Sequence, residues 1–474
     1  MYCNVLVTKP FDHTFTYKLK PNQAVTKGSI VLVPFGKKND QIGMVYETYK
    51  NLPKEASGIR LKNIEFVFIN LCFNKKLIEF IDWIANYTLA PKGIVLKLFL
   101  VNTKILKHEI TKDKDISFNL KNLDLNKEQQ KAFNIINKSL VSNYHSIVLE
   151  GVTGSGKTEV YFEAINKILS QKKQVLILLP EISLTPQLEK RFKYRFGFYP
   201  DIWHSKITEK NKKNTWHRCY QGNPLIVVGA RSSLFLPFNN FGLIVVDEEH
   251  DLSFKQEDNI RYQARDLAIV KAKIEEFPIL LSSATPSFET HNNIKKKKFT
   301  HLYLPSQFSG LELPDIELIN LQNEKFEKNN WVSIKVLQAL KESFIKGEQS
   351  LLFLNRRGYS PLTLCHNCGY RYQCNLCTSW LVLHKQKNRL LCHHCGTIYP
   401  IVSICPKCNE KDSLKLIGPG VERLAEEVKN FFPKYKIGIM SSDNANTPNK
   451  LKKIINDFEN KKIDILVATQ IMAK

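Results

Sequence analysis

A glycine-rich segment between an apolar run and a helical pattern places the strongest constraint on the fold. Residues 151–158 read Gly-Val-Thr-Gly-Ser-Gly-Lys-Thr, which fits the phosphate-binding pattern G-x-x-x-x-G-K-[ST]. The apolar residues 146–150 before it predict a buried strand, and residues 158–170 after it predict a helix. Between a strand and a helix, backbone N–H groups can close around phosphates; a chance glycine-rich turn is the alternative. The segment therefore predicts a parallel α/β sheet that binds a nucleoside triphosphate.

An acidic motif, Asp247-Glu-Glu-His, stands at the end of another apolar run, residues 242–246. Parallel strands point their carboxyl ends at the ligand crevice, so we expect Asp247 to hold Mg²⁺ through water and Glu248 to orient or deprotonate the attacking water. A solvated acidic turn is the alternative. The predicted catalytic residues are Lys157, Asp247 and Glu248, and the predicted nucleotide contacts of the first motif are Gly151, Gly154, Ser155, Gly156, Lys157 and Thr158, with Thr158 reaching Mg²⁺.

Eight of the eleven cysteines form four C-x-x-C pairs within residues 365–408. A C-x-x-C turn presents two thiolates to one tetrahedral Zn²⁺, so four turns predict two closed, structural Cys₄ sites. Redox-active surface dithiols are the alternative, and the spacing does not say which pairs share an ion. Cys3, Cys72 and Cys219 stand alone and are expected to be small core residues. The predicted ligands are Cys365, Cys368, Cys374, Cys377, Cys392, Cys395, Cys405 and Cys408.

The charge balance favours a polyanionic partner. The chain has 69 Lys and Arg residues against 45 Asp and Glu residues, a formal net charge of +24. The lysines are mostly scattered, which also fits a merely solvated surface, but no basic amphipathic helix or lipidation signal favours a membrane over nucleic acid. The N-terminal residues lack the apolar run of a signal peptide, and no apolar stretch is long enough to span a membrane, so we expect a cytoplasmic protein.

The hydrophobic pattern divides the chain into regions. Residues 1–100 predict a small α+β domain with strands at 29–34 and 41–46 and a helix at 75–87, and residues 101–122 predict a linker. Beyond the linker, apolar strands alternate with helices, which predicts parallel sheets covered on both faces. The predicted strands are 146–150, 174–180, 225–229, 242–247 and 278–283 in a first lobe, 123–303, and 350–354, 436–440 and 463–469 in a second lobe, 304–474, which also carries the helix 421–432 and the cysteine insertion 365–408.

Seven motifs make the chain similar to superfamily 2 helicases, and closely similar to the PriA family of replication restart helicases, also called primosomal protein N′. The resemblance extends over nearly the whole chain, and the cysteine insertion after the last motif is its most specific feature. It implies two stacked RecA-like lobes and an N-terminal β-rich domain that captures the 3′ end of the nascent leading strand. The motifs are Leu125–Gln129, Gly151–Glu159, Pro180–Gln187, Gly229–Ser232, Asp247–Asp251, Ser283–Pro286 and Asn355–Gly358.

The resemblance also implies an activity, partners and a metal arrangement. Members of this family unwind DNA in the 3′-to-5′ direction with ATP, recognise stalled forks and begin primosome assembly. The implied partners are forked and single-stranded DNA, single-stranded-DNA-binding protein and other primosome components, for a chain expected to be a monomer. The implied zinc ligands are nested: Cys365, Cys368, Cys405 and Cys408 share one Zn²⁺, and Cys374, Cys377, Cys392 and Cys395 share the other.

Family analogy gives roles to single residues outside the glycine-rich and acidic motifs. Gln129 would read adenine. Four further residues would contact the DNA strand or couple the lobes, although each could equally be structural: Arg231, Ser283, Thr285 and Arg357.

Residues 251–262 resemble the aromatic-rich coupling loop of the family. In that loop Phe254 and Tyr262 would stack on bases, or else pack against the lobe. Ile260 occupies a place that is often aromatic in relatives, which weakens the stacking interpretation.

Two departures from the family pattern affect the expected function. The winged-helix domain that usually precedes Leu125 is replaced by the short linker, so we expect reduced recognition of fork arms. The sequence also stops at Lys474, before the arginine-bearing motif of the second lobe. An arginine finger contributes on the order of 10³–10⁵ in rate, so we expect a fragment, or the product of a degraded or split gene, that binds ATP but hydrolyses it poorly.

Two other classes of function stay open. One is a scaffold that binds forks and recruits partners without turnover. The other is an RNA helicase or duplex translocase with an unrelated zinc module.

Overall fold

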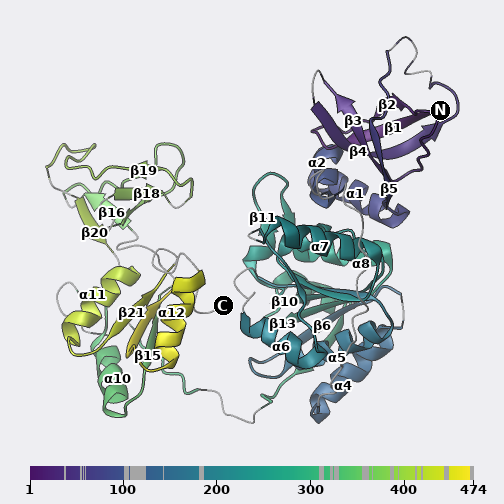
Figure 1. Cartoon of the computed structure of the whole chain (residues 1–474). Helices are drawn as coiled ribbons and strands as arrows, with labels where there is room; N and C mark the ends of the chain where they lie inside the picture. The colour runs from purple at the N-terminus through teal and green to yellow at the C-terminus, as the bar shows by residue number, and fades with distance from the viewer. Residues whose placement is uncertain are drawn as a thin grey trace. The chain divides into compact units, whose positions relative to one another are not determined.

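The structure is a computed structural model with two compact units, Met1–Leu313 and Pro314–Lys474 (Figure 1). No described helix is both long and apolar enough to cross a membrane. The predicted linker lies outside the described residues except at Leu106. The structure describes residues 1–36, 39–53, 56, 58, 60–100, 106, 124–141, 143–180, 186–205, 207–308, 314–320, 324, 330–354, 362–365, 367–384, 389–392, 394–411, 414–417, 420–441 and 448–469.

The N-terminal domain, residues 1–100, is an antiparallel sheet in the order β2-β1-β4-β3-β5 with two helices. Alternate residues of a strand face opposite sides, so Ile30 and Leu32 pack toward the helices, whereas Val31 and Val33 pack into a separate core. Its elements are β1 (Tyr2–Val7), β2 (Phe15–Lys18), β3 (Ser29–Phe35), β4 (Asn39–Tyr49), β5 (Phe66–Cys72), α1 (Lys75–Thr88) and α2 (Lys92–Phe99).

The first lobe, residues 124–308, is built on a seven-stranded parallel sheet in the order β14-β6-β13-β10-β7-β9-β8. Five of the strands correspond to the five predicted runs. The other two, β8 and β14, lie at the sheet edges, where side chains are partly exposed and the apolar signal is weak. The strands are β6 (Ser146–Gly151), β7 (Gln174–Leu178), β8 (Asp201–Trp203), β9 (Leu225–Gly229), β10 (Phe241–Asp247), β13 (Ile279–Ser283) and β14 (Thr300–Leu304).

Helices cover both faces of this sheet, as predicted (Figure 1). In β7, Val175 and Ile177 belong to one core with α4, α5 and α6, whereas Leu176 and Leu178 belong to another with α7 and α8. The helices are α4 (Lys127–Ser139), α5 (Lys157–Ser170), α6 (Pro186–Phe196), α7 (Glu209–Gln221), α8 (Ala264–Glu275) and α9 (Phe288–Lys295); the 3-10 helices η3 (Arg231–Phe235) and η4 (Leu252–Phe254) and the short strands β11 (Lys255–Gln256) and β12 (Tyr262–Gln263) complete the lobe.

The N-terminal domain shares one hydrophobic core with the first lobe. The indole N–H of Trp216 donates to the carbonyl of Phe99 at 3.1 Å. Lys271 of α8 is fully buried; its Nζ pairs with Glu275 at 2.8 Å and lies 4.8 Å from the ring centre of Phe80. These contacts join the two parts across a continuous apolar interface, which a flexible tether would not form.

The second unit contains a three-stranded parallel sheet in the order β15-β22-β21. In its central strand, Ile465 and Val467 pack with α10 and α11, and Leu466 and Ala468 pack with α12. The elements are α10 (Ile334–Ile345), β15 (Ser350–Phe353), α11 (Val421–Phe431), β21 (Ile437–Met440), α12 (Pro448–Glu459) and β22 (Ile465–Ala468).

The cysteine insertion follows β15 and is made of short antiparallel strands. Its hydrophobic core is small: Tyr372, Leu381 and Leu390 pack with the buried Cys374 and Cys392. The strands are β16 (Leu362–Cys365), β17 (Leu381–His384), β18 (Arg389–Cys392), β19 (Ile398–Tyr399) and β20 (Leu414–Ile417).

Candidate functional sites

The glycine-rich segment forms the turn between β6 and α5, as predicted. Gly154 and Gly156 have φ of +80° and +78°, which glycine adopts far more readily than other residues. Gly151 is required by close approach, because a Cβ there would lie 2.6 Å from Ser155 Oγ. The turn thus presents backbone N–H groups around a space that side chains would otherwise fill, at the N-terminus of α5. This cradle fits a polyphosphate.

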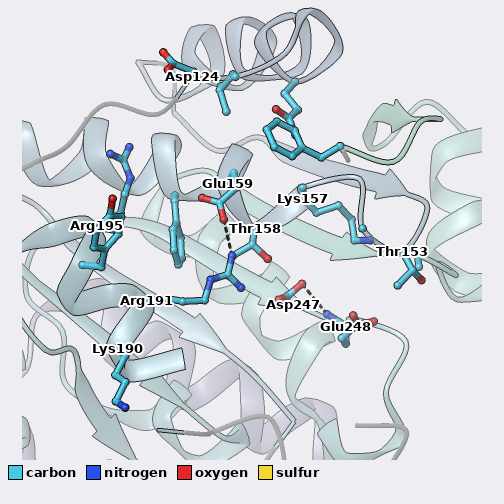
Figure 2. A pocket seen from close by; sticks show the side chains of 18 residues that line it. Asp124, Thr153, Lys157, Thr158, Glu159, Lys190, Arg191, Arg195, Asp247 and Glu248 are labelled. Atoms are coloured by element: carbon cyan, nitrogen blue, oxygen red, sulfur yellow. Dashed lines mark hydrogen bonds and ion pairs between the residues drawn. The ribbon is translucent and has the colours of Figure 1, made fainter. Parts of the chain in front are cut away.

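Lys157 begins α5 and its Nζ donates to the carbonyl of Gly151 at 2.7 Å. Partial burial lowers the pKa of Lys157, and the nearby carboxylates of Glu248 and Asp247 oppose this shift. Figure 2 shows Lys157 and Thr158 facing Asp247 and Glu248 across the site. The two predicted motifs therefore meet in one place, with the ammonium group between the glycine turn and the acidic pair.

Asp247 ends β10 and its carboxylate is held from two sides. Oδ1 accepts from Ser282 Oγ at 2.7 Å, and Oδ2 accepts from Tyr161 OH at 3.0 Å. Burial, followed by the charge of Asp247, raises the pKa of Tyr161, so the phenol stays a donor. Sequence reasoning missed both partners. Tyr161 had a detectable signal, since it lies one helical turn after Lys157 on the same face of α5.

Glu248 has φ of +51°, in the left-handed region that is unfavourable for residues other than glycine. Its carboxylate lies 3.6 Å from His250 Nδ1. Burial, followed by the charge of Asp247, raises the pKa of Glu248, while His250 and Lys157 lower it. This strained backbone aims a second carboxylate at the site, and its raised pKa makes it a stronger proton acceptor than an ordinary Glu.

Glu249, the third acidic residue of the motif, is fully buried and was not predicted to have a role. It pairs with Arg265 Nη1 at 2.9 Å and accepts from the backbone N–H of Ser287 at 2.7 Å and from Thr290 Oγ1 at 3.0 Å. It therefore joins the end of β10 to the first turn of α8 and to α9, on both sides of the predicted Ser283–Pro286 motif.

The site opens into a cavity of about 760 Å³, large enough for a nucleotide. Lys157, Asp247 and Glu248 line this cavity, and so does Gln129. Gln129 caps α4 together with Asn126, and its Nε2 donates to the carbonyl of Ser155 at 2.9 Å. Its amide thus ties α4 to the glycine turn, and adenine recognition by Gln129 stays a prediction.

The structure places three of the four predicted DNA-contact or coupling residues close to the acidic motif or its following loop. Arg231 donates to the carbonyls of Ser253 and Lys255 at 3.1 and 2.8 Å. Ser283 Oγ is buried and is hydrogen-bonded to His250 Nδ1 at 2.8 Å, and it accepts from the backbone N–H of Thr285. These contacts support coupling more directly than DNA contact. Thr285 is exposed.

Arg357, the fourth of these residues, lies outside the described residues together with the rest of the Asn355–Gly358 motif, and so do residues 181–185 of the Pro180–Gln187 motif.

The structure does not support base stacking by Phe254 and Tyr262. Phe254 is 1% and Tyr262 is 8% exposed, and both belong to the core of the first lobe, where Tyr262 packs edge-on against Phe235. Packing against the lobe, the alternative interpretation, therefore describes both rings. Burial of apolar surface favours this arrangement, and a ring within the core has no face free for a base. A coupling role of the loop stays a prediction.

The eight clustered cysteines form two groups of four, and in each group the sulfur atoms lie within 4.8 Å of one another. Sulfur pairs between the two halves of a group are separated by 3.4 to 3.7 Å. A tetrahedral Zn–S distance of about 2.3 Å gives S–S separations of about 3.8 Å, whereas a disulfide requires about 2.05 Å. The geometry thus fits two zinc sites. The groups are nested: Cys365, Cys368, Cys405 and Cys408, and Cys374, Cys377, Cys392 and Cys395.

A parallel sheet with a glycine-rich phosphate loop and a strand-end Asp-Glu pair is the architecture of a P-loop nucleotide-binding lobe, and the family match places this lobe among the helicases. Residues 126–294 match the DEAD/DEAH box helicase family. Residues 4–101 match the 3'DNA-binding domain (3'BD) of PriA, and residues 374–398 match the PriA DNA helicase Cys-rich region (CRR) domain. The chain belongs to the PriA family of replication restart proteins.

Curated relatives agree with this assignment. The replication restart protein PriA of Rickettsia conorii is 43% identical over 98% of this chain and 70% of that protein. PriA of Haemophilus influenzae is 42% identical over 74% of this chain and 48% of that protein, and PriA of Bacillus subtilis is 38% identical over 74% and 44%. A solved structure of RecG bound to a three-way DNA junction is 16% identical with a TM-score of 0.40, covering 73% of this chain and 36% of RecG.

Proposed function

We propose that the chain is the ATP-dependent motor of a replication restart helicase that moves 3′ to 5′ on DNA at stalled or abandoned forks. The observation that carries this proposal is the meeting of Lys157, Asp247 and Glu248 at one cavity. That cavity lies in the same compact unit as the domain that matches a 3′ DNA-binding domain. Because one hydrophobic core joins the nucleotide site to this domain, a conformational change at one of them can alter the conformation of the other.

The chemistry at the nucleotide site divides among four side chains. Lys157 would neutralise charge on the phosphates, and Thr158 and Asp247 would hold Mg²⁺, which supplies further charge neutralisation when bound. Glu248 would take a proton from the attacking water at its carboxylate. Tyr161 and Ser282 restrain Asp247 by hydrogen bonds, so that its carboxylate keeps one orientation.

Coupling to DNA would pass through contacts of the acidic motif. His250 reaches Ser283, and Arg231 holds the loop that follows the motif by two carbonyl contacts. Movement of either contact on DNA binding would shift Asp247 and Glu248. The two zinc ions would be structural, because four thiolates at each ion leave no open coordination position.

Binding of a fork, and recruitment of single-stranded-DNA-binding protein and other primosome components, follow from family membership and are part of the proposal. The net charge of +24 supports a nucleic-acid partner, and the N-terminal domain would capture the 3′ end of the nascent leading strand.

The first experiment is ATP hydrolysis by the chain with and without forked DNA, with Lys157→Ala as the blank. Forks whose leading-strand 3′ end stands at the branch, and forks whose 3′ end is blocked by phosphate, test the N-terminal domain in the same assay. We expect turnover that is slow but above the blank, and that rises with the unblocked fork. Turnover equal to the blank, with fork binding retained, would identify a scaffold without hydrolysis, and a strict preference for RNA would contradict a DNA helicase.

A further inference from the structure

The segment that leaves β14 folds back over the glycine turn. The backbone N–H of Phe308 donates to the carbonyl of Gly154 at 2.9 Å, and Ser306 Oγ donates to Glu128 at 3.2 Å. Gln307 supplies the side-chain atoms nearest to Gly154. Phe308 is therefore positioned by the phosphate loop itself and by the first turn of α4.

Phe308 combines exposure with a place in the wall of the cavity. It is 57% exposed, although it is a large apolar residue, and it lines the nucleotide cavity. Leu125 and Gln129 line the same cavity, and a Cβ on Gly156 would lie 2.3 Å from Gln129 Nε2 and 3.9 Å from Phe308 Cβ. Gln129 and Phe308 thus both lie next to the same glycine.

The cavity has two chemically different ends. Lys157, Asp247 and Glu248 mark the phosphate end, and Figure 2 shows Asp124 at the end away from the two carboxylates. A nucleotide with its phosphates at the glycine turn would direct its base away from the acidic pair. An exposed aromatic face beside a side-chain amide offers a purine a stacking surface and a hydrogen-bonding group.

We propose that Phe308 is the stacking residue for the base of the bound nucleotide. This inference rests on the proposed ATP binding and extends it, because it assigns base recognition to the segment after β14 in addition to the predicted Gln129. Phe308 would contribute to the affinity for nucleosides and leave the affinity for phosphate chains unchanged.

The test compares ATP with inorganic tripolyphosphate, which has no base, by isothermal titration calorimetry with Mg²⁺. In Phe308→Ala we expect ATP to bind about 10-fold more weakly, as for loss of one base–aromatic stack, and tripolyphosphate to bind as in the unmodified chain. Phe308→Tyr keeps the ring and should restore ATP affinity. The matched control is Tyr303→Ala, an aromatic residue of β14 that is 53% exposed and does not line the cavity.

Three outcomes would overturn the assignment. Unchanged ATP affinity in Phe308→Ala would show that the ring makes no contact with the base. Equal weakening of both ligands would show that Phe308 only supports the glycine turn. Loss of ATP affinity in Tyr194→Ala but not in Phe308→Ala would move the base to the α6 wall of the cavity. An unmodified chain that binds neither ligand would instead refute the proposed nucleotide site as a whole.

Discussion

At the scale of single residues, the candidate site contains features that are unfavourable for folding and that persist because the surrounding structure stabilises them. Asp247 and Glu248 bring two carboxylates together, and Glu248 adopts a left-handed backbone conformation. Neither feature favours folding, and both put charge where a metal ion and a water molecule would be needed. Stability and function therefore make opposite demands on these residues.

The pH dependence of stability should report this conflict. Because the folded chain raises the pKa of Glu248 above its ordinary 4.5, its ionised form destabilises the fold at neutral pH, and the effect disappears below pH 4.5, where the residue is protonated in both states. We expect Glu248→Gln to have a higher Tm than the unmodified chain at pH 8 in EDTA and an equal Tm at pH 4. An equal Tm at both pH values, measured by calorimetry, would contradict the prediction.

Comparing alanine substitutions at Gly156 and Gly222 distinguishes the effect of backbone strain from the effect of a steric clash. Gly156 and Gly222 both have φ of +78°, but a Cβ would lie 2.3 Å from Gln129 Nε2 in the first case and no closer than 3.5 Å to any atom in the second. We expect Gly222→Ala to lose about 1–2 kcal/mol of stability and keep nucleotide binding. Gly156→Ala should in addition weaken ATP binding at least about 10-fold, since a loss of about 1.4 kcal/mol is tenfold in affinity. Binding by Gly156→Ala equal to that of Gly222→Ala would refute this prediction.

At the scale of secondary-structure elements, Glu249 is the point where β10, α8 and α9 are connected. Its carboxylate has no solvent access and takes hydrogen bonds from Arg265, Ser287 and Thr290. A buried carboxylate with this many donors defines the relative positions of the elements that carry them. The loop that contains Phe254 and Tyr262 begins beside Glu249 and ends next to Arg265. The ion pair between Glu249 and Arg265 therefore also holds the two ends of this loop together.

Removing one partner of this ion pair should be far more damaging than removing one partner of a surface pair. We expect Arg265→Met to lose about 3–5 kcal/mol in urea unfolding, because it leaves Glu249 buried without its charge partner. The double change Glu249→Gln with Arg265→Met should lose less than the sum of the single changes. Arg191→Met is the matched control, since Arg191 and Glu159 are 50% and 32% exposed and should contribute at most about 1 kcal/mol. Additive losses would contradict a coupled pair.

At the scale of the whole molecule, the chain consists of two units with different sources of stability. The first unit has extensive apolar cores shared by the sheet, its helices and the N-terminal domain. The cysteine insertion of the second unit has only a small core, made partly of cysteines. Because so little apolar surface is buried there, metal binding must supply the stability that a larger core supplies elsewhere.

Metal content should therefore follow the two cysteine groups. We expect two Zn²⁺ per chain by mass spectrometry of metals, and one after either Cys365→Ser or Cys374→Ser. Cys72 is exposed, so the expectation that it is a core residue was wrong, and Cys72→Ser should keep both ions. ATP binding should survive each change because the nucleotide cavity lies in the first unit. Fewer than two ions in the unmodified chain, or loss of both from one variant, would contradict two independent sites.

The amino-acid sequence by itself was enough to predict the parallel sheet of the first lobe, the meeting of Lys157 with Asp247 and Glu248, and the two groups of four cysteines. These features depend on local signals: continuous apolar strands, glycines with a required backbone conformation, and thiols at a spacing that one turn can present to a metal ion. Which cysteine pairs share an ion was predicted only from the family resemblance, because the spacing alone leaves several pairings open.

Only the tertiary structure showed which side chains hold Asp247, what Glu249 does, and that Phe254 and Tyr262 are buried. Asp247 is 86 residues from Tyr161 and 35 residues from Ser282, so no local pattern joins them. Burial of an aromatic ring likewise depends on which elements cover it, and stacking on a base or packing in a core requires the same residue type. Local chemistry is visible in a sequence, whereas hydrogen bonds and burial between distant segments exist only after the chain has folded.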